Sequence, residues 1–291
     1  MIYDAAIIGA GPAGVSAALN LKIHEKNFIW LGSKTLSDKA GKAERVSNYP
    51  GLPGVTGREL NAAFLKHIQS MDIPITDQMV NSILPRGKGR YALMAGREFY
   101  EAKTILFATG IANTATLKGE SGLVGKGVSY CATCDGALYK GRTIAIVITS
   151  PRFEHEANYL TGLAKEVLLF AQYQNCGVDM SNVSVMGSVL AAIEGEKRVE
   201  AVRCTDGTVY PVDGVFCLRE SVALATLLPG LAVENGHIAV DRTMATNLPG
   251  IYAAGDCTGR PYQYTKAVGE GNIAAHSILE YLAEAEKADG K

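Results

Sequence analysis

The sequence predicts an α/β fold with two parallel-sheet domains, the second inserted in the first. An apolar strand followed at once by a turn and a helix occurs twice, at Tyr3–Ile8 and at Thr143–Ile148, as expected for strand–helix–strand units. Polar, turn-rich segments at Asn113–Glu120 and Asp241–Thr246 mark where the chain would leave the first domain and return. The expected domains are 1–112 with 244–291, and 113–243.

The composition is that of a globular protein with room for two domains. The chain has 291 residues, of which 47% are hydrophobic and 20% charged, and domains are usually about 100–150 residues long. The net charge of −1 gives no reason to expect nucleic acid or an acidic membrane surface as a partner. We find no apolar run of about 18 residues and no secretory leader after Met1. Six cysteines are too few for a secreted disulfide framework, so we expect a cytoplasmic protein.

A glycine-rich turn follows the first apolar strand. The segment Gly9–Gly14 reads Gly-Ala-Gly-Pro-Ala-Gly, and Val15–Lys22 continues with helical spacing. In this context Gly9 permits the turn, Gly11 lets the backbone approach a pyrophosphate, and Gly14 lets the helix pack on the strand. The amides at the helix N-terminus then face the phosphates. The segment predicts a dinucleotide site.

The next elements add a ribose contact and a loop. The strand Phe28–Leu31 is followed by Gly-Ser-Lys, so the hydroxyl of Ser33 stands where a ribose-binding carboxylate is usual. The turn residues of Asn48–Gly54 form either a plain surface loop or a loop folded over a cofactor. Arg58–Met71 has the spacing of an amphipathic helix. Gly250–Asp256 is a buried strand that ends in Gly-Asp.

The remaining elements of the first domain are strands and a closing helix. Tyr91–Met94 and Glu98–Tyr100 are expected as short antiparallel strands, and Thr104–Gly110 as a second buried strand that ends in a turn. Val268–Leu282 is expected as the closing helix, with its apolar residues in the core.

The segment Cys131-Ala-Thr-Cys134-Asp135-Gly carries the candidate chemistry. Two cysteines three apart can form a disulfide and exchange it with that of another protein. The carboxyl group of Asp135 can protonate a leaving thiolate. Half of a zinc site would look the same, but zinc needs two more ligands. A redox pair is favoured because the other four cysteines are isolated: Cys176, Cys204, Cys217 and Cys257.

The second domain lacks the glycines of a nucleotide site. After its first apolar strand, Thr149 and Pro151 would crowd a pyrophosphate, and proline also removes an amide donor. Glu154 and Glu156 place carboxylates in the first turn of the next helix, where phosphate would be repelled. No arginine cluster follows the strand Val167–Phe170 to hold a 2′-phosphate. The sequence therefore predicts a nucleotide-domain scaffold without its site.

The rest of the second domain is predicted to be β-rich. Val199–Cys204 and Val209–Val212 form a hairpin, and Val215–Leu218 is a further strand. Arg219 ends that strand, where a phosphate-binding fold often has glycine.

Four motifs together resemble the low-molecular-weight flavoprotein thioredoxin reductases, in that family's order and over nearly the whole chain. They are Gly9–Gly14, Asn48–Gly51, Cys131–Gly136 and Gly255–Asp256. The resemblance implies two Rossmann-like domains of the pyridine nucleotide-disulfide oxidoreductase type, the second inserted in the first. It also implies an FAD cofactor, thioredoxin as substrate and a homodimer.

The resemblance also implies roles for single residues. Cys134 would face the flavin, Cys131 would attack thioredoxin, and Asp135 would donate a proton. Tyr262 stands where family members usually carry arginine. The residues that would contact FAD are Gly9, Gly11, Pro12, Ala13, Gly14, Ser33, Asn48, Gly255 and Asp256, with Gln263 and Tyr264 near the isoalloxazine edge.

The departure at Thr149–Phe153 narrows the resemblance to the ferredoxin-dependent flavin thioredoxin reductases. Cys131–Gly141 and Gly255–Gly271 are especially similar to that branch. Ferredoxin delivers single electrons whereas a disulfide takes two, and a flavin can exchange either. Ferredoxins are acidic, so the candidate docking cations are Lys118, Lys126, Lys140 and Arg142.

Three other functions are compatible with parts of the pattern. One is an NAD(P)H-dependent thioredoxin reductase with a divergent nucleotide site, and another is a regulatory flavoprotein that senses redox state. The third is a disulfide-linked NAD dehydrogenase without flavin. Reduction of a bound flavin by NADPH or by reduced ferredoxin separates the first of these from the ferredoxin-dependent enzyme.

Overall fold

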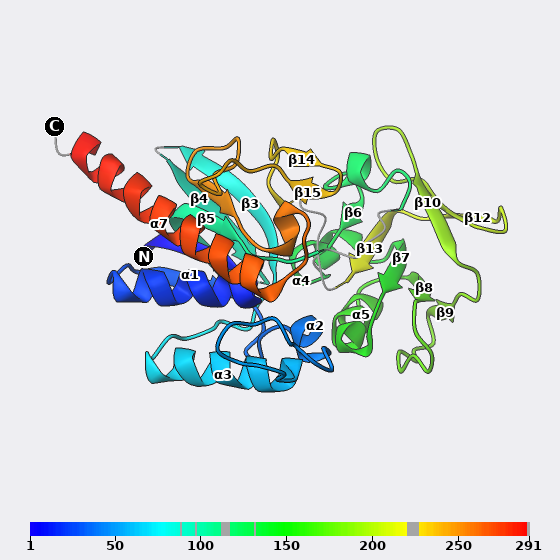
Figure 1. The fold of residues 1–291 in the computed structure, drawn as a ribbon. Helices are drawn as coiled ribbons and strands as arrows, with labels where there is room; N and C mark the ends of the chain where they lie inside the picture. The colour runs from blue at the N-terminus through cyan, green and yellow to red at the C-terminus, as the bar shows by residue number, and fades with distance from the viewer. Residues whose placement is uncertain (88, 97, 112–116, 131, 220–226, 290–291) are drawn as a thin grey trace. The chain divides into compact units, whose positions relative to one another are not determined.

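The computed structural model describes residues 1–87, 89–96, 98–111, 117–130, 132–219 and 227–289 (Figure 1). The chain forms two compact units: unit 1 is Met1–Ala112 with Leu227–Lys291, and unit 2 is Asn113–Thr226. The predicted α/β class is confirmed, and one unit is inserted in the other. The return to unit 1 falls before residue 227, whereas the sequence places it before residue 244.

Hydrogen bonds explain why the segment from residue 227 to 243 lies in unit 1. The side chain of Asn247 accepts a hydrogen bond from the Ala232 amide at 2.9 Å and donates one to the Gly230 carbonyl at 2.8 Å. The ring Nε2 of His237 lies 2.8 Å from the hydroxyl of Tyr262. These contacts join residues distant in sequence, so turn composition alone does not indicate them.

Unit 1 contains a six-stranded sheet of order β2-β1-β5-β4-β3, with β16 paired to β5. Its strands are β1 (Ile2–Ile8), β2 (Phe28–Leu31), β3 (Val80–Gly87), β4 (Arg90–Ala95), β5 (Glu98–Phe107) and β16 (Ile251–Ala253), with a separate hairpin of β14 (Val233–Glu234) and β15 (His237–Ile238). Its helices are α1 (Pro12–Ile23), α2 (Asp38–Gly41), α3 (Gly57–Ser70), α7 (Tyr264–Asp289) and the 3₁₀ turn η4 (Asp256–Thr258).

Strand β5 joins two segments that the sequence predicts as separate strands. Its first half pairs antiparallel with β4 and its second half pairs parallel with β16, while β1 pairs along nearly its whole length. The polar residues near its middle do not break it, because these neighbours supply hydrogen-bond partners on both sides.

Helices α1 and α7 pack against each other at close range, and Figure 1 shows them side by side. A Cβ atom on Gly271 would lie 2.2 Å from the Ala13 carbonyl oxygen, so only glycine permits this approach. The contact fixes the first turns of α7 beside the start of α1. Helix α7 extends beyond the predicted Val268–Leu282 at both ends, since its alanine, glutamate and lysine residues are strong helix formers.

Unit 2 contains a parallel sheet of order β6-β13-β7-β8-β9 and an antiparallel sheet of order β10-β11-β12. The strands are β6 (Val128–Ser129), β7 (Thr143–Ile148), β8 (Glu166–Ala171), β9 (Val183–Val185), β10 (Leu190–Glu194), β11 (Ala201–Cys204), β12 (Val209–Pro211) and β13 (Gly214–Leu218). The helices are α4 (Ala132–Asp135) and α5 (Glu154–Thr161), with the 3₁₀ turns η1 (Ser121–Leu123), η2 (Gly136–Tyr139) and η3 (Pro151–Phe153). The predicted hairpin is confirmed as β11–β12, and β10 is an additional strand.

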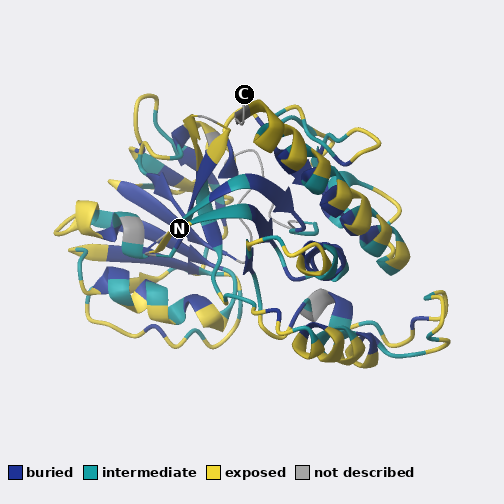
Figure 2. Ribbon diagram, turned by 90° about the vertical axis from the view of Figure 1, so that its left-hand side faces the viewer, coloured by how far each residue is buried: buried dark blue, intermediate teal, exposed yellow. Residues whose placement is uncertain are grey.

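Each unit has its own apolar core. In Figure 2 the sheet strands are mostly in the buried colour, and the helices carry one buried and one exposed side. In unit 1 the core lies between the sheet and helices α1 and α7; in unit 2 it lies between the parallel sheet and α5. Among the described residues, no helix has the length and apolar character needed to cross a membrane.

Candidate active site

The turn after β1 approaches a neighbouring strand closely. Gly9 has φ of +110°, and a Cβ atom on it would lie 2.3 Å from the Ala108 carbonyl oxygen. A Cβ atom on Gly14 would lie 2.2 Å from the Gly9 oxygen, which also accepts a hydrogen bond from the Trp30 indole at 3.0 Å. The side-chain direction of Gly11 is open by comparison, with the Ala108 oxygen 3.9 Å away. This geometry leaves room for a ligand only at the middle glycine.

The N-terminus of α1 is suited to an anion. Gly11 is its N-cap, Pro12 is its first residue, and within this described turn there is neither a capping side chain nor an acidic residue. The first amides of a helix have no acceptor within the helix, and they carry the positive end of its dipole. A phosphate group is the usual partner for such amides.

Four parallel strands bring the other candidate residues to the same edge of the sheet. Strands β2, β1, β5 and β16 run in one direction, so their carboxyl ends lie together. Ser33 follows β2, and Gly255 and Asp256 follow β16. A Cβ atom on Gly255 would lie 3.1 Å from the Cβ atom of Ala13. The turn after β16 therefore adjoins the start of α1.

Two side-chain contacts connect the loop after β2 with the start of α7. The amide of Asn48 donates to Oε1 of Gln263 at 2.8 Å, and the hydroxyl of Tyr264 donates to the Ala40 carbonyl at 3.0 Å. Burial raises the pKa of the Tyr264 phenol. The predicted loop over a cofactor thus contacts the segment predicted to reach the flavin. All eleven predicted cofactor residues are described and lie in unit 1.

The redox segment begins after strand β6. Cys131 lies outside the described residues, and Cys134 is placed by its backbone within α4. Asp135 ends α4, and its Oδ2 accepts a hydrogen bond from the hydroxyl of Ser129 at 2.7 Å. This bond fixes the carboxyl group predicted to donate a proton.

A glutamate of α5 also holds the redox helix. The carboxyl group of Glu156 accepts a hydrogen bond from the Ala132 amide at the start of α4, and burial raises the Glu156 pKa. From the sequence we expected the Glu156 carboxylate only to repel a pyrophosphate. Its observed partner shows a structural role in positioning α4.

A buried ion pair lies beside the same segment. Glu120 is fully buried and Arg219 is 5% exposed. Arg219 Nη2 donates to Glu120 Oε2 at 2.8 Å, the hydroxyl of Tyr130 donates to Oε1 at 2.7 Å, and the Leu117 amide donates to Oε2 at 2.8 Å. Because Tyr130 directly precedes the redox motif, this network anchors the motif to the end of β13.

The carboxyl end of β7 is occupied by groups of the protein itself. The hydroxyl of Ser150 accepts a hydrogen bond from the Arg152 amide at 3.3 Å. Oε1 of Glu154, at the start of α5, accepts hydrogen bonds from the Gly177 amide and the Tyr173 hydroxyl, both at 2.8 Å. These bonds lower the pKa of Glu154, so its carboxylate stays charged. Helix α5 also lacks a capping side chain, but it follows the Ser150-capped turn η3 and carries acids in its first turn, whereas α1 has neither feature.

The four isolated cysteines are unpaired thiols. Burial raises the pKa of Cys217 to about 12 and that of Cys257 to about 11. Because the thiolate is the reactive form, such thiols are poor nucleophiles near neutral pH. Cys217 and Cys257 are therefore poor candidates for a redox centre.

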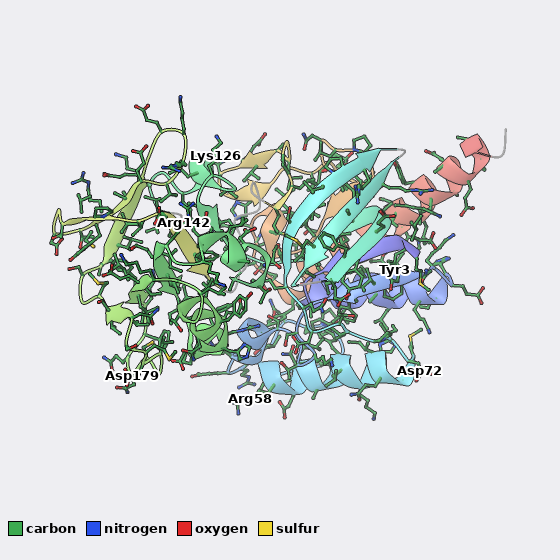
Figure 3. The ribbon with its side chains drawn as sticks, turned by 180° about the vertical axis from the view of Figure 1, so that it is seen from behind. Tyr3, Arg58, Asp72, Lys126, Arg142 and Asp179 are labelled. Atoms are coloured by element: carbon green, nitrogen blue, oxygen red, sulfur yellow. The ribbon has the colours of Figure 1, made fainter. Side chains whose placement is uncertain are left out.

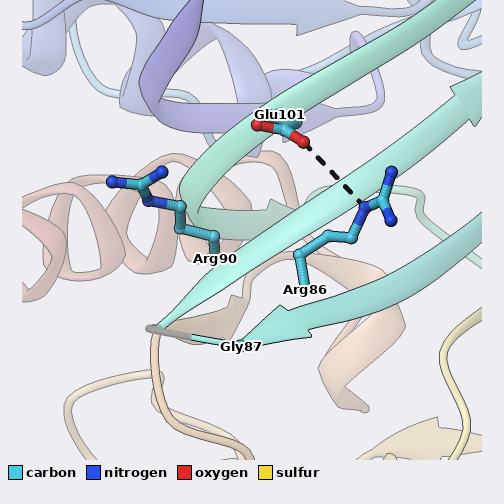
Figure 4. Close-up of a pocket in the computed structure, with 4 residues that line it drawn as sticks. All are labelled: Arg86, Gly87, Arg90 and Glu101. Carbon is cyan, nitrogen blue, oxygen red and sulfur yellow. Dashed lines mark ion pairs between the residues drawn. The ribbon is translucent and has the colours of Figure 1, made fainter.

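A hollow of about 260 Å³ in unit 1 lies away from these residues. It is lined by Arg86, Gly87, Arg90 and Glu101 (Figure 4), and Arg86 Nε lies 3.9 Å from Glu101 Oε1. Glu101 pairs with Ile2 at the start of β1, roughly 20 Å from Gly9 at the usual rise per residue. The hollow does not belong to the candidate cofactor site.

Sequence reasoning missed the residues that hold the site from outside the motifs. These residues are Ser129, Glu120, Tyr130, Lys266 and Glu270. Arg219 stood out in the sequence as an unusual end for its strand, but its partner lies 99 residues away.

The profile of the pyridine nucleotide-disulphide oxidoreductase family matches residues 3–149 and 163–271. The chain belongs to this family. Within it, the thioredoxin reductase of Listeria innocua is 31% identical, over 99% of this chain and 96% of that protein. Thioredoxin reductases of this class bind FAD, so the chain is a member of a flavoprotein oxidoreductase family.

Two solved structures of ferredoxin-flavin thioredoxin reductases from Clostridium acetobutylicum are more similar. One is 42% identical with a TM-score of 0.88, covering 98% of this chain and 99% of that chain. The other is 44% identical with a TM-score of 0.86, covering 97% and 99%. The resemblance found in the sequence, to the thioredoxin reductases and most closely to the ferredoxin-dependent branch, is confirmed.

Proposed function

We propose that this protein reduces thioredoxin through FAD and the Cys131/Cys134 disulfide, with electrons from reduced ferredoxin. The observation that carries the choice of donor is the contrast between the two helix starts. The α1 start is uncapped and without acids, whereas the α5 start carries Glu154, bonded to Gly177 and Tyr173. The first favours a dinucleotide, and the second disfavours one.

The groups of unit 1 fit FAD. The amides that follow Gly11 would bind the pyrophosphate, the hydroxyl of Ser33 and the carboxyl of Asp256 would contact sugar hydroxyls, and Gln263 and Tyr264 would border the isoalloxazine. FAD, when bound, takes up single electrons and passes two to a disulfide. The protein contributes binding and orientation.

The chemistry at the disulfide follows from thiol exchange. The Cys131 thiolate attacks the thioredoxin disulfide, forming a mixed disulfide and releasing one thioredoxin thiolate. Asp135, held by Ser129 at 2.7 Å, gives this leaving thiolate its proton. The Cys134 thiolate then attacks the Cys131 sulfur and breaks the mixed disulfide, which restores the protein disulfide and releases the second thioredoxin thiolate, protonated from solvent. Each cycle consumes two electrons and two protons.

The proposal includes a docking surface and an assembly state. The four predicted docking cations (Lys118, Lys126, Lys140 and Arg142) are exposed in unit 2, and Figure 3 labels Lys126 and Arg142. Arg142 also pairs with Asp213 at 3.4 Å. We propose that these cations attract an acidic ferredoxin, and that the enzyme is a cytoplasmic homodimer, as the sequence resemblance implies.

Anaerobic flavin reduction tests the proposal. The purified protein is mixed with reduced ferredoxin or with NADPH, and flavin absorbance is followed by stopped flow. We expect bleaching with ferredoxin and none on the same timescale with NADPH. Rapid bleaching by NADPH would instead support the NAD(P)H-dependent alternative. A protein without flavin would contradict the proposal as a whole.

A further inference from the structure

Lys266 and Glu270 lie on successive turns at the start of α7, next to the candidate cofactor edge. Their side chains are each 16% exposed, and Nζ of Lys266 lies 3.0 Å from Oε2 of Glu270. An exposed lysine–glutamate pair at this spacing contributes little to stability. This pair is largely buried and bonds to the backbone of a functional loop, so its role differs.

Lys266 binds both ends of the turn after β16. Its ammonium group donates to the carbonyl oxygens of Gly255 at 2.8 Å and Gly259 at 2.9 Å. It also lies 3.0 Å from the hydroxyl oxygen of Thr258. One cation thus closes the loop Gly255–Gly259, which contains the predicted FAD contacts.

Glu270 binds the same loop through an amide and a hydroxyl group. Its Oε2 accepts hydrogen bonds from the Gly255 amide at 2.8 Å and the Thr258 hydroxyl at 2.9 Å. Both backbone groups of Gly255 are therefore held by this pair. Gly255 has φ of +89° and lies against α1, so its position affects the whole edge.

The charges of the pair also matter for an anionic ligand. A carboxylate next to the start of α1 would repel the phosphates of a dinucleotide if it were not compensated. Lys266 compensates it at hydrogen-bond distance. The pair itself then has no net charge, so holding the loop adds no negative charge next to the phosphates.

We propose that Lys266 and Glu270 are a positioning pair for the FAD site. Both side chains hold the Gly255–Gly259 loop in place, and the Lys266 ammonium group compensates the negative charge of the Glu270 carboxylate. The inference rests on the proposed FAD cofactor and deepens it, because it assigns FAD affinity to residues outside the glycine motifs.

FAD titration of the apo-protein tests the pair. Lys266→Met removes the cation and keeps most of the apolar stem, so FAD binding should weaken roughly 10- to 100-fold, the usual effect of losing a hydrogen bond to a charged group. The double variant Lys266→Met/Glu270→Gln should bind FAD more tightly than Lys266→Met, since the uncompensated charge is gone. Exposed residues of the same helix supply controls: Lys287→Met and Glu286→Gln should bind as the wild type does.

Glu270→Gln gives a second readout with little change in shape. It leaves Lys266 as an unpaired cation, so FAD binding should become more sensitive to salt than in the wild type. Circular dichroism of each apo-variant checks folding. Should Lys266→Met fail to fold, the salt dependence of Glu270→Gln decides the inference.

Three results would overturn the inference and leave the proposed function intact. The first is an FAD affinity of Lys266→Met equal to that of the wild type, and the second is a double variant that binds FAD no more tightly than Lys266→Met. The third is a salt dependence of FAD binding in Glu270→Gln equal to that of the wild type. A wild-type protein that takes up no FAD would overturn both.

Discussion

Replacing Arg219 by methionine should destabilise unit 2 strongly, because it leaves a buried carboxylate without its cation. Arg219 Nη2 lies 2.8 Å from Glu120 Oε2, and the two side chains are 5% and 0% exposed. Removing one partner of a buried pair costs about 3–5 kcal/mol. The Tyr130 hydroxyl and the Leu117 amide still donate to Glu120, so we expect the lower part of that range, about 3–4 kcal/mol.

Arg142→Met is the matched control. Arg142 and Asp213 also form an ion pair in unit 2, but at 3.4 Å and with side chains 51% and 40% exposed. Exposed pairs contribute about 0–1 kcal/mol. Urea unfolding at neutral pH, followed by circular dichroism, gives the two free-energy losses.

The double variant Arg219→Met/Glu120→Leu tests whether the loss of stability in Arg219→Met comes from the unpaired Glu120 carboxylate or from altered packing. An apolar replacement of a buried ion pair is often neutral, so this variant should regain most of the stability lost by Arg219→Met. Thioredoxin reduction should fall in Arg219→Met while FAD content stays normal, because Tyr130 precedes the redox motif and the proposed FAD contacts lie in unit 1. Equal losses in Arg219→Met and Arg142→Met would refute the reasoning from burial.

Four further substitutions test the cofactor site and the redox motif. Cys134→Ser should trap thioredoxin as a mixed disulfide with Cys131, visible on a non-reducing gel; trapping by Cys131→Ser instead would reverse the two roles. Asp135→Asn should slow turnover without affecting disulfide formation, which thiol titration and steady-state rates distinguish. Gly9→Ala should abolish FAD uptake, since its Cβ would lie 2.3 Å from a carbonyl oxygen; normal flavin content in the folded variant would contradict the assigned turn. For Glu156→Gln the prediction concerns pH. Burial raises the Glu156 pKa above 4.5, so the wild type should lose stability relative to this variant as pH rises from that value through the raised pKa. Urea unfolding at about pH 4 and about pH 8 measures this difference, which should grow with pH.

The sequence predicted the parts of the fold that depend on neighbours along the chain. Strands of a parallel sheet are buried on both faces and therefore consist mostly of apolar residues, so the apolar run before Gly9 indicated such a strand. The spacing of the glycines indicated the turn that follows it. The amphipathic helix at Arg58–Met71 matches α3 within one residue at each end. The Thr56–Glu59 capping box at its start is a local signal of the same kind.

The residues that support the site could not be found in this way. Glu120 and Arg219 meet only because β13 and the segment before β6 lie together in the folded sheet. Lys266 and Glu270 have the spacing of any exposed helix pair, and nothing local shows that they are buried. Such contacts depend on the tertiary fold. A sequence motif therefore identifies the reactive side chains but not the side chains that hold them in position.

The two helix starts show how one scaffold can serve two different purposes. In unit 1 the turn before α1 ends at Gly11, and Pro12 begins the helix with no carboxylate in its first turn, so the first amides stay available to a ligand. In unit 2 the first turn of α5 carries two carboxylates that bind other parts of the protein. Glu154 accepts a hydrogen bond from the loop after β8, and Glu156 accepts one from the start of α4. Restoring glycine at Thr149 and Pro151 should therefore not restore a nucleotide site, because both glutamates would remain in the first turn of α5, where they disfavour a phosphate. Removing Glu156 would also release the redox helix. The proposed absence of a nucleotide site and the positioning of α4 thus both involve the first turn of α5, so a single substitution there should affect both.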